Sequence, residues 1–202
     1  MSVSAVLLAA GQSTRMGQNK ALLAWKGQTM LEYHLDQLRQ TSIEKTVVVL
    51  GFEAERLQPL VAETAKASVI INADYLSGRC SSIKAGIRVL PPQSDSVLIL
   101  AIDQPRPYYL LEALIKYHQK RRHLITMPVY QGRRGHPTLF ARSLFAELLE
   151  ISEETAGLLQ VVRRHQKKVA ELPVPSPIVL IDLNDRSDYE KALSLPDIRL
   201  TG

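Results

Sequence analysis

The sequence has 202 residues, of which 46% are hydrophobic and 22% are charged, and its formal net charge is +5. A chain of this length can bury a core unaided, and its single cysteine, Cys80, excludes a framework of intrachain disulfides. We find no secretory signal pattern and no apolar run close to the ~20 residues of a membrane helix. The sequence therefore predicts one cytoplasmic domain over residues 1–202, with no membrane contact.

Two basic stretches raise the question of anionic partners, which a basic surplus favours. KYHQKRRH (residues 116–123) and RRHQKK (residues 163–168) each follow a segment with helical spacing of apolar residues. We interpret both as charged C-terminal ends of helices, where cations complement the helix dipole. The alternative is a nucleic-acid surface. Aromatic residues make up only 5% of the chain and do not interleave either stretch as a stacking platform requires, so no nucleic acid is expected.

Strand and helix patterns alternate along the first part of the chain. Nearly unbroken apolar runs predict buried strands at residues 3–10, 45–51, 67–72 and 95–103. Apolar residues at helical spacing predict helices at residues 29–40, 53–65, 80–90 and 108–119. Repeated strand–helix–strand units form a mostly parallel sheet with helices on both faces. Ligands of such sheets bind beyond the carboxyl ends of the strands, so candidate sites are expected there.

The pattern is less regular in the later part of the chain. We predict strands at residues 124–130, 136–141, 168–174 and 178–183. Helices are predicted at residues 143–151, 154–165 and 185–195. Most of the histidines lie in helical or basic surroundings and are predicted to be surface residues; these are His34, His118, His123 and His165.

The loop after the first strand, within LLAAGQSTRMGQNKALL (residues 7–23), combines glycines with two cations. Gly11 and Gly17 allow backbone N–H groups to approach a ligand, and consecutive N–H groups form an anion-binding nest. Arg15 adds a fork suited to phosphate oxygens, and Lys20 adds a point charge. The spacing fits neither a P-loop nor G-x-G-x-x-G. The sequence predicts a polyphosphate-binding loop; the alternative is an ordinary loop with two solvated cations.

Acidic and amide side chains follow two further apolar runs. Asp103 ends the fourth predicted strand and suits Mg²⁺, which takes few carboxylates and completes its shell with phosphate oxygens; alternatively, Asp103 caps the next helix. In LIDLNDRSDY, Asp182 and Asn184 are two residues apart and point the same way along a predicted strand. One or both are candidates to complete a metal site opposite Asp103. Asp185 and Asp188 suit the start of the final helix.

Together these stretches resemble the ordered motifs of the MobA-like nucleotidyltransferases, and most closely the molybdenum cofactor cytidylyltransferases. The resemblance rests on LAAGQSTRMGQNKALL, GRCSSIKAGI, DQP, GRRGHPTLF and DLNDRSDYEKA, from the first strand to the final helix. It implies an α/β fold, a Rossmann-like three-layer α/β/α sandwich of the nucleotide-diphospho-sugar transferase type. The sheet would be mostly parallel with a late antiparallel strand. In the family, LAAG accompanies cytidine enzymes and LAGG guanosine enzymes, so Ala10 favours CTP over another nucleoside triphosphate.

The resemblance implies roles for residues of the first loop. Arg15, Lys20 and Asp103 are the implied catalytic residues, with the two cations on the triphosphate and Asp103 on Mg²⁺, the implied cofactor. Residues 72–82 would lie beside the base, the ribose and the acceptor. The implied nucleotide-binding residues are Leu8, Ala9, Ala10, Gly11, Ser13, Arg15, Gly17, Lys20, Asn72 and Ser82.

The implied acceptor site and the second metal ligand lie later in the chain. Gly135, His136 and Pro137 would face the acceptor, with His136 binding or orienting it rather than acting as a nucleophile. Relatives often read Asp-x-Asp or Asn-x-Asn near the last strand, whereas this chain has Asp182 and Asn184. The second metal ligand therefore stays open between these two residues.

The implied reaction transfers CMP from CTP to the terminal phosphate of molybdopterin or the molybdenum cofactor and releases pyrophosphate. A phosphate monoester has a second pKa of about 6, so the dianion attacks the α-phosphorus without a general base. A molybdenum hydroxylase is an implied recipient of the product. One alternative is a sugar- or polyol-phosphate nucleotidyltransferase, but those enzymes usually carry proline where Asn19 precedes Lys20. The other is a non-catalytic molybdopterin-binding accessory protein, which would not need the metal clamp at Asp103.

Overall fold

The structure is a computed structural model that describes residues 1–62 and 64–193, without the side chain of Arg15. The strands of the main sheet are β1 (Val3–Ala9), β4 (Lys45–Leu50), β5 (Ala67–Ile71), β6 (Ser96–Ala101), β7 (Ile125–Tyr130), β8 (Arg133–Arg134), β9 (Thr138–Ala141) and β10 (Val169–Pro173). A small hairpin consists of β2 (Ala24–Trp25) and β3 (Gln28–Thr29). The helices are α1 (Met30–Arg39), α2 (Ala54–Ala62), α3 (Arg79–Arg88), α4 (Tyr108–Lys120), α5 (Phe145–Leu149), α6 (Leu158–Arg164) and α7 (Arg186–Leu193). None of the helices in these ranges is long and apolar enough to cross a membrane.

The main sheet is mostly parallel, as predicted. Its strands lie in the order β10-β7-β9-β6-β1-β4-β5, with β8 paired to β7. β1 pairs in parallel with both β4 and β6, and every residue of β1 and β6 is buried. β9 is antiparallel to both of its neighbours, β6 and β7. The expected late antiparallel strand is therefore confirmed.

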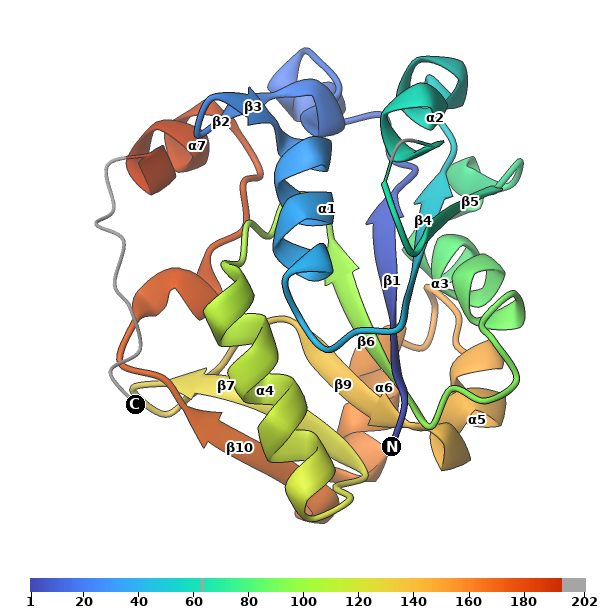
Figure 1. Cartoon of the computed structure of the whole chain (residues 1–202), viewed down its shortest axis with the longest axis vertical. Coiled ribbons are helices and arrows are strands. Elements are labelled where there is room, and N and C mark those ends of the chain that lie inside the picture. The colour runs from blue at the N-terminus through green and yellow to red at the C-terminus, as the bar shows by residue number, and fades with distance from the viewer. Residues whose placement is uncertain (63, 194–202) are drawn as a thin grey trace.

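Helices cover both faces of the sheet, which makes the predicted three-layer sandwich (Figure 1). Successive side chains of a strand point to opposite faces, and β1 shows this directly. Leu7 packs in the core that includes residues of α1, α2 and α4, whereas Leu8 packs in the core that includes residues of α3 and α6. The sheet is thus held between two separate apolar layers.

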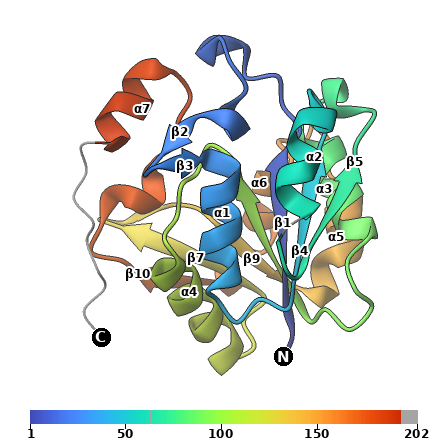
Figure 2. The same ribbon diagram turned by 45° about the horizontal axis from the view of Figure 1, so that its top comes forward.

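The central parallel strands all end at the same edge of the sheet. The arrowheads of β1, β4 and β6 point to the top of Figure 1, where the loop after β1, the β2–β3 hairpin and α7 also lie. Figure 2 brings this edge forward. The loops that carry the candidate site residues therefore meet at one end of the molecule.

Side-chain caps explain where two helices begin. Thr29 and Glu32 form a reciprocal capping box at the start of α1. Asp185 accepts a hydrogen bond from the backbone N–H of Asp188 at 2.9 Å, which confirms its predicted role as a cap. The basic stretches also lie as predicted, because α4 ends at Lys120 and α6 at Arg164. Residue 63 and residues 194–195 of the predicted helices lie outside the described residues.

The strand predicted at residues 178–183 is wrong. Residues Pro177–Leu180 form a 3-10 helix, and the chain then runs to α7 without joining the sheet. The carbonyl groups of Val179 and Ile181 accept hydrogen bonds from the guanidinium of Arg106 instead of from a neighbouring strand. The apolar run at residues 178–183 thus correctly indicated a segment that packs against the protein, but it did not indicate whether that segment pairs with a strand of the sheet.

The prediction of surface histidines is wrong for His34 and His118, which are both fully buried. His118 lies between the hydroxyl groups of Ser96, at 2.9 Å, and Thr126, at 2.8 Å. These contacts satisfy both ring nitrogens, so a polar ring is tolerated on the buried face of α4. Burial also lowers the pKa of His118 to about 4, which keeps the imidazole neutral at pH 7.

Candidate active site

A cavity of about 360 Å³ opens at the carboxyl ends of β1 and β6. Loops from distant parts of the sequence meet around it. Its lining residues are Leu8, Ala10, Gly11, Ser13, Thr14, Lys20, Tyr75, Gly78, Arg79, Ser82, Ala101, Ile102, Asp103 and Asn184. The structure therefore brings together most of the predicted nucleotide-binding residues, the carboxylate of Asp103 and one of the two candidate second metal ligands.

The loop after β1 turns Lys20 toward this cavity. Ser13 and Gly17 have left-handed φ values of 55° and 69°, which allow the tight turn between them. The hydroxyl of Ser13 accepts a hydrogen bond from the backbone N–H of Lys20 at 3.2 Å. Asn19 accepts one from the N–H of Ala21 at 3.0 Å and so caps the next short helix. The backbone of Lys20 is thereby fixed on both sides.

Lys20 and Asp103 form a buried ion pair. The Nζ of Lys20 lies 3.1 Å from Oδ2 of Asp103, and each side chain is only 11% exposed. Lys20 is therefore not a solvated surface cation, which excludes the ordinary-loop alternative for this residue. Asp103 does not cap the following helix either, because α4 begins after Pro107. The other carboxylate oxygen, Oδ1, is buried and has no hydrogen-bond partner in the described part of the chain.

His34 supports the strand end that carries Asp103. Its Nε2 lies 3.1 Å from the carbonyl oxygen of Ile102, and burial lowers the pKa of His34 to about 4. The ring is therefore neutral at pH 7, and Nε2 carries the proton because a carbonyl can only accept. This contact fixes the backbone immediately before Asp103.

The 3-10 helix Tyr75–Ser77 and the start of α3 form a further wall within residues 72–82, the stretch expected beside the nucleotide and the acceptor, although Tyr75 and Arg79 were not predicted individually. Asn72 donates hydrogen bonds to Ser81 at 2.8 Å and to Ser82 at 3.0 Å, so it braces the wall, while its own side chain lines a neighbouring cavity. Arg79 and Tyr75 line the main cavity. Arg79 is exposed and makes no ion pair among the residues described. Arg79 is the first residue of α3, where a positive charge is unfavourable next to the positive end of the helix dipole. This unfavourable placement is a signal in the sequence that could have indicated a functional role.

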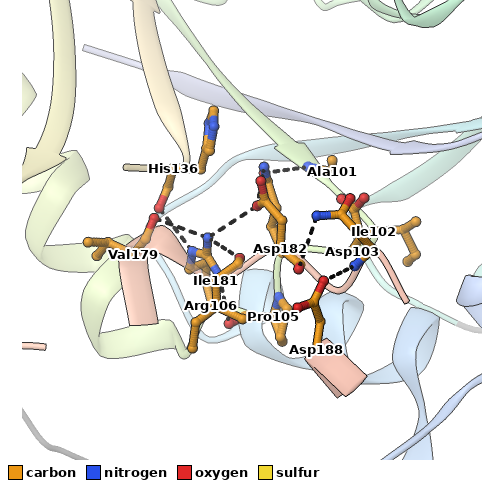
Figure 3. A network of polar contacts seen from close by, with 12 residues as sticks. Ala101, Ile102, Asp103, Pro105, Arg106, His136, Val179, Ile181, Asp182 and Asp188 are labelled. Carbon is orange, nitrogen blue, oxygen red and sulfur yellow. Dashed lines mark hydrogen bonds and ion pairs between the residues drawn. The ribbon is translucent and has the colours of Figure 1, made fainter. Parts of the chain in front are cut away.

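The segment after residue 180 brings Asn184 to the cavity but keeps Asp182 out of it. The backbone N–H of Leu183 donates to the carbonyl of Asp103 at 2.8 Å, and Asn184 lines the cavity beside it. Asp182 instead accepts a hydrogen bond from Gln104 at 3.0 Å and lies 3.9 Å from Arg106 (Figure 3). Asp182 is thus occupied by contacts within the protein.

The predicted acceptor residues lie close to this segment but do not line the main cavity. The backbone of His136 donates to the carbonyl of Val179 at 2.8 Å, and its own carbonyl faces Arg106 while the imidazole points away (Figure 3). Burial lowers the pKa of His136, opposed by the nearby Asp182. The imidazole is therefore neutral at pH 7 and suits a binding role.

Other predicted residues lie elsewhere. Ala9 points into the core on the α1 side of the sheet, and Gly17 lies in the loop outside the cavity lining. The side chain of Arg15 lies outside the described residues. Within the described ranges, no group of three or more His, Cys, Asp or Glu side chains is placed to hold a metal ion. A hard cation here would need ligand oxygens besides the protein carboxylates.

The fold is an α/β sandwich with a cavity at the carboxyl ends of its central strands, and comparisons with known proteins identify its family. The MobA-like NTP transferase domain matches residues 5–169, and the chain belongs to that family. It is therefore a nucleotidyltransferase by family.

Three relatives illustrate the similarity. The chain is 25% identical over 149 residues to the molybdenum cofactor cytidylyltransferase of Escherichia coli K12, covering 74% of this chain and 75% of that protein. It is 28% identical over 197 residues to nicotine blue oxidoreductase of Paenarthrobacter nicotinovorans, covering 93% and 90%. The crystal structure of Rv0371c from Mycobacterium tuberculosis H37Rv superposes with a TM-score of 0.83 at 26% identity, covering 96% and 99%. Another structure of that protein, with a TM-score of 0.78 at 25% identity over 96% and 100%, is a complex with manganese.

Proposed function

We propose that the chain transfers CMP from CTP to the terminal phosphate of molybdopterin or the molybdenum cofactor, with release of pyrophosphate. The observation that carries the proposal is the buried Lys20–Asp103 pair, in which Oδ1 of Asp103 has no hydrogen-bond partner among the described residues, at the wall of a cavity beside the loop after β1. Ala10 lines that cavity, and the similarity to a molybdenum cofactor cytidylyltransferase supports CTP and this acceptor. A molybdenum hydroxylase is the proposed recipient of the product.

The chemistry needs alignment and charge neutralisation rather than a base. An oxygen of the acceptor dianion bonds to the α-phosphorus of CTP, the bond from that phosphorus to the bridging oxygen breaks, and pyrophosphate leaves with the electron pair. Among the described residues that line the cavity there is no histidine, in keeping with an acceptor that is already ionised at neutral pH. Lys20, with Arg15 as the second proposed cation, stabilises the charge that develops on pyrophosphate.

The side chains fit a hard divalent cation. Oδ1 of Asp103 is a buried carboxylate oxygen that no donor in the described ranges reaches, and such an atom is costly unless a ligand satisfies it. Asn184 is the second residue that would hold Mg²⁺, because it lines the same cavity and its amide nitrogen is directed to the carbonyl of Asp182 at 3.4 Å. When bound, Mg²⁺ would neutralise triphosphate charge and polarise the α-phosphate. The manganese complex of Rv0371c supports divalent metal use.

Pyrophosphate release tests the proposal directly. We would measure it with Mg²⁺ and CTP, GTP or ATP, each with molybdopterin and with a panel of sugar and polyol phosphates. We expect release with CTP and molybdopterin, no release without the acceptor, and a product heavier by one CMP unit in mass spectrometry. Asp103→Ala serves as the inactive control.

Each other outcome identifies a different function. Release only with a sugar or polyol phosphate would contradict the acceptor and support the related nucleotidyltransferases. Tight molybdopterin binding without any release would indicate an accessory protein. Redox conversion of nicotine blue with an added electron donor or acceptor, and no pyrophosphate formed, would align the chain with its oxidoreductase relative.

A further inference from the structure

Arg106 is the most deeply buried cation of the molecule as described, and the sequence did not single it out. It lies in the loop between β6 and α4, and its side chain is 0% exposed. Burial lowers the pKa of Arg106 to about 10, which the nearby Asp182 opposes, so the guanidinium stays charged at pH 7. A buried charge is costly unless it is paired and hydrogen-bonded, so its contacts explain why it is kept.

The guanidinium of Arg106 joins three segments of the chain. Its Nε donates to the carbonyl of His136 at 2.9 Å, and its Nη2 donates to the carbonyls of Val179 at 3.2 Å and Ile181 at 2.8 Å. Its Nη1 donates to the carbonyl of Pro105 at 3.3 Å. Figure 3 shows these groups converging on Arg106 from different sides. Backbone carbonyls, rather than a single carboxylate, are its main partners.

The segments around His136 and Val179, which Arg106 joins, also contact each other directly. The N–H of Gly135 donates to Pro128, and the N–H of His136 donates to the carbonyl of Val179, both at 2.8 Å. A Cβ on Gly135 would lie 2.2 Å from the carbonyl oxygen of Val179, so only glycine permits this approach. Arg106 and Gly135 therefore maintain one junction by independent means.

This junction continues into the nucleotide cavity. From Ile181 the chain passes through Asp182, which accepts a hydrogen bond from Gln104, to Leu183, which donates to the carbonyl of Asp103. The position of residues 135–137 is thus linked through Arg106 to the backbone of Asp103. A shift of about 1 Å between reacting groups can reduce a rate about 100-fold, so such a link matters for a two-substrate reaction.

We propose that Arg106 is a positioning residue for the acceptor. It holds residues 135–137 and 179–184 in register with Asp103, so that an acceptor phosphate bound beside His136 meets the α-phosphorus of the nucleotide. The inference rests on the proposed function, because it assigns residues 135–137 to the acceptor side. If Arg106 has a purely structural role, its substitution lowers only the stability of the protein. If it is a positioning residue, its substitution lowers kcat/KM for the acceptor and leaves the affinity for CTP unchanged.

The test compares Arg106→Met, Arg106→Lys and Gly135→Ala with the wild type. We would measure the acceptor KM and kcat by pyrophosphate release, the CTP Kd with Mg²⁺ by calorimetry, and the Tm. We expect the acceptor kcat/KM to fall roughly 10- to 100-fold in Arg106→Met and Gly135→Ala, with a CTP Kd within about twofold of the wild type. Arg106→Lys should recover part of the loss, because a point charge replaces only some of the hydrogen bonds.

Arg142→Met is the matched control. Arg142 also donates to backbone carbonyls, those of Pro92 and Ser94, but it follows the end of β9 that pairs with the first residue of β6, whereas the cavity lies at the carboxyl end of β6. The Arg142→Met substitution should lower the Tm without changing the acceptor kcat/KM. An unchanged acceptor kcat/KM in folded Arg106→Met, or an equal loss of CTP affinity, would overturn the proposal. If Arg106→Met does not fold, an unchanged Gly135→Ala overturns it.

Failure of the proposed function gives a different result. In that case the wild type itself releases no pyrophosphate with CTP and molybdopterin. The variants are then compared with the wild type by the turnover of whichever phosphomonoester of the panel is a substrate. If none is a substrate, they are compared by their Kd for molybdopterin, measured by calorimetry. A loss of that affinity or turnover with CTP binding intact supports the role of Arg106, and no loss contradicts it.

Discussion

Two buried polar clusters of this molecule differ in one respect. His118, between Ser96 and Thr126, has partners on both ring nitrogens and is far from the cavity. Asp103, which lines the cavity, has a partner, Lys20, on one carboxylate oxygen, and none of the residues described here is a partner of the other oxygen. Both clusters join distant elements through side chains that are nearly or fully buried. Only the second keeps an unused acceptor atom.

The comparison separates stabilising polar groups from functional ones. A buried polar group without a partner costs about 1–3 kcal/mol, so folding alone does not favour Oδ1 of Asp103 as it stands. A satisfied cluster, such as that of His118, specifies packing and needs no ligand. We therefore expect changes at Asp103 to reduce activity with the fold intact, and changes at His118 to reduce stability with activity intact.

Asp103→Ala should have the largest effect. We expect kcat/KM for CTP to fall roughly 1000-fold or more, because the change removes the carboxylate that would hold the metal. The circular dichroism spectrum should stay that of the wild type. Asp36→Ala is the matched control, since this carboxylate pairs with Arg39 on the surface of α1 and lies outside the cavity, and the variant should retain metal-dependent turnover. Equal losses in both variants would contradict the distinction.

Lys20→Ala should have the next largest effect. Lys20 is proposed to act on departing pyrophosphate, so kcat should fall about 10- to 100-fold while the acceptor KM changes little. Arg15→Ala is expected to behave in the same way from its place in the sequence. Steady-state kinetics with the acceptor varied at saturating CTP provides the measurement. Unchanged kcat with a raised acceptor KM would place the loop on the acceptor instead.

His118→Leu tests the satisfied cluster. The change leaves the Ser96 and Thr126 hydroxyls without this partner, so the free energy of unfolding at pH 7.5 should fall by about 1–3 kcal/mol. Turnover per folded molecule should stay that of the wild type. Urea unfolding followed by circular dichroism, with activity measured below the transition, checks both statements. A loss of turnover in the folded variant would place His118 in the functional machinery.

The stability difference between the wild type and His118→Leu should also depend on pH. The pKa of His118 is lowered to about 4 in the folded state, so the unfolded chain takes up the proton first as the pH falls. The stability contributed by neutral His118 is complete above about pH 6.5 and is lost as the pH falls toward about 4. The stability difference between wild type and His118→Leu should therefore shrink over this range. A constant difference would mean that His118 does not titrate as proposed.

Ala10→Gly should have the smallest effect. Ala10 lines the cavity, and its methyl group narrows the space proposed for the base. The preference for CTP over GTP should fall by an amount at the low end of the roughly 1–3 kcal/mol that one methyl group is worth in a pocket. Competition between the two nucleotides measures it. An unchanged preference would assign base selection to residues 72–82.

Much of the fold could be predicted because it depends on local patterns. β1 and β6 are unbroken apolar runs and lie at the centre of the sheet, and Thr29 with Glu32 forms a capping box that ends a loop and begins a helix. The apolar run at residues 178–183 was misassigned because its carbonyls find a partner in Arg106, a contact that no local pattern contains.

The site was predictable where its chemistry follows a strand. Asp103 comes directly after a buried run, and its place at the carboxyl edge follows from the parallel sheet. Which of Asp182 and Asn184 lines the cavity was not predictable, because it depends on a backbone contact between Leu183 and Asp103. Buried His34 and His118 were missed for the same reason, since their partners lie 68 and 22 residues away along the chain.

The most direct test of the account is the metal dependence of nucleotide binding. We would titrate cytidine 5′-(α,β-methylene)triphosphate, which cannot be cleaved at the α-phosphorus, into wild type and Asp103→Asn by calorimetry, with and without Mg²⁺. We expect Mg²⁺ to tighten binding to the wild type about 10-fold or more, and this gain to be lost in Asp103→Asn. The same gain in both proteins, or no binding to the wild type at all, would contradict the assignment of Asp103 to a metal–nucleotide site.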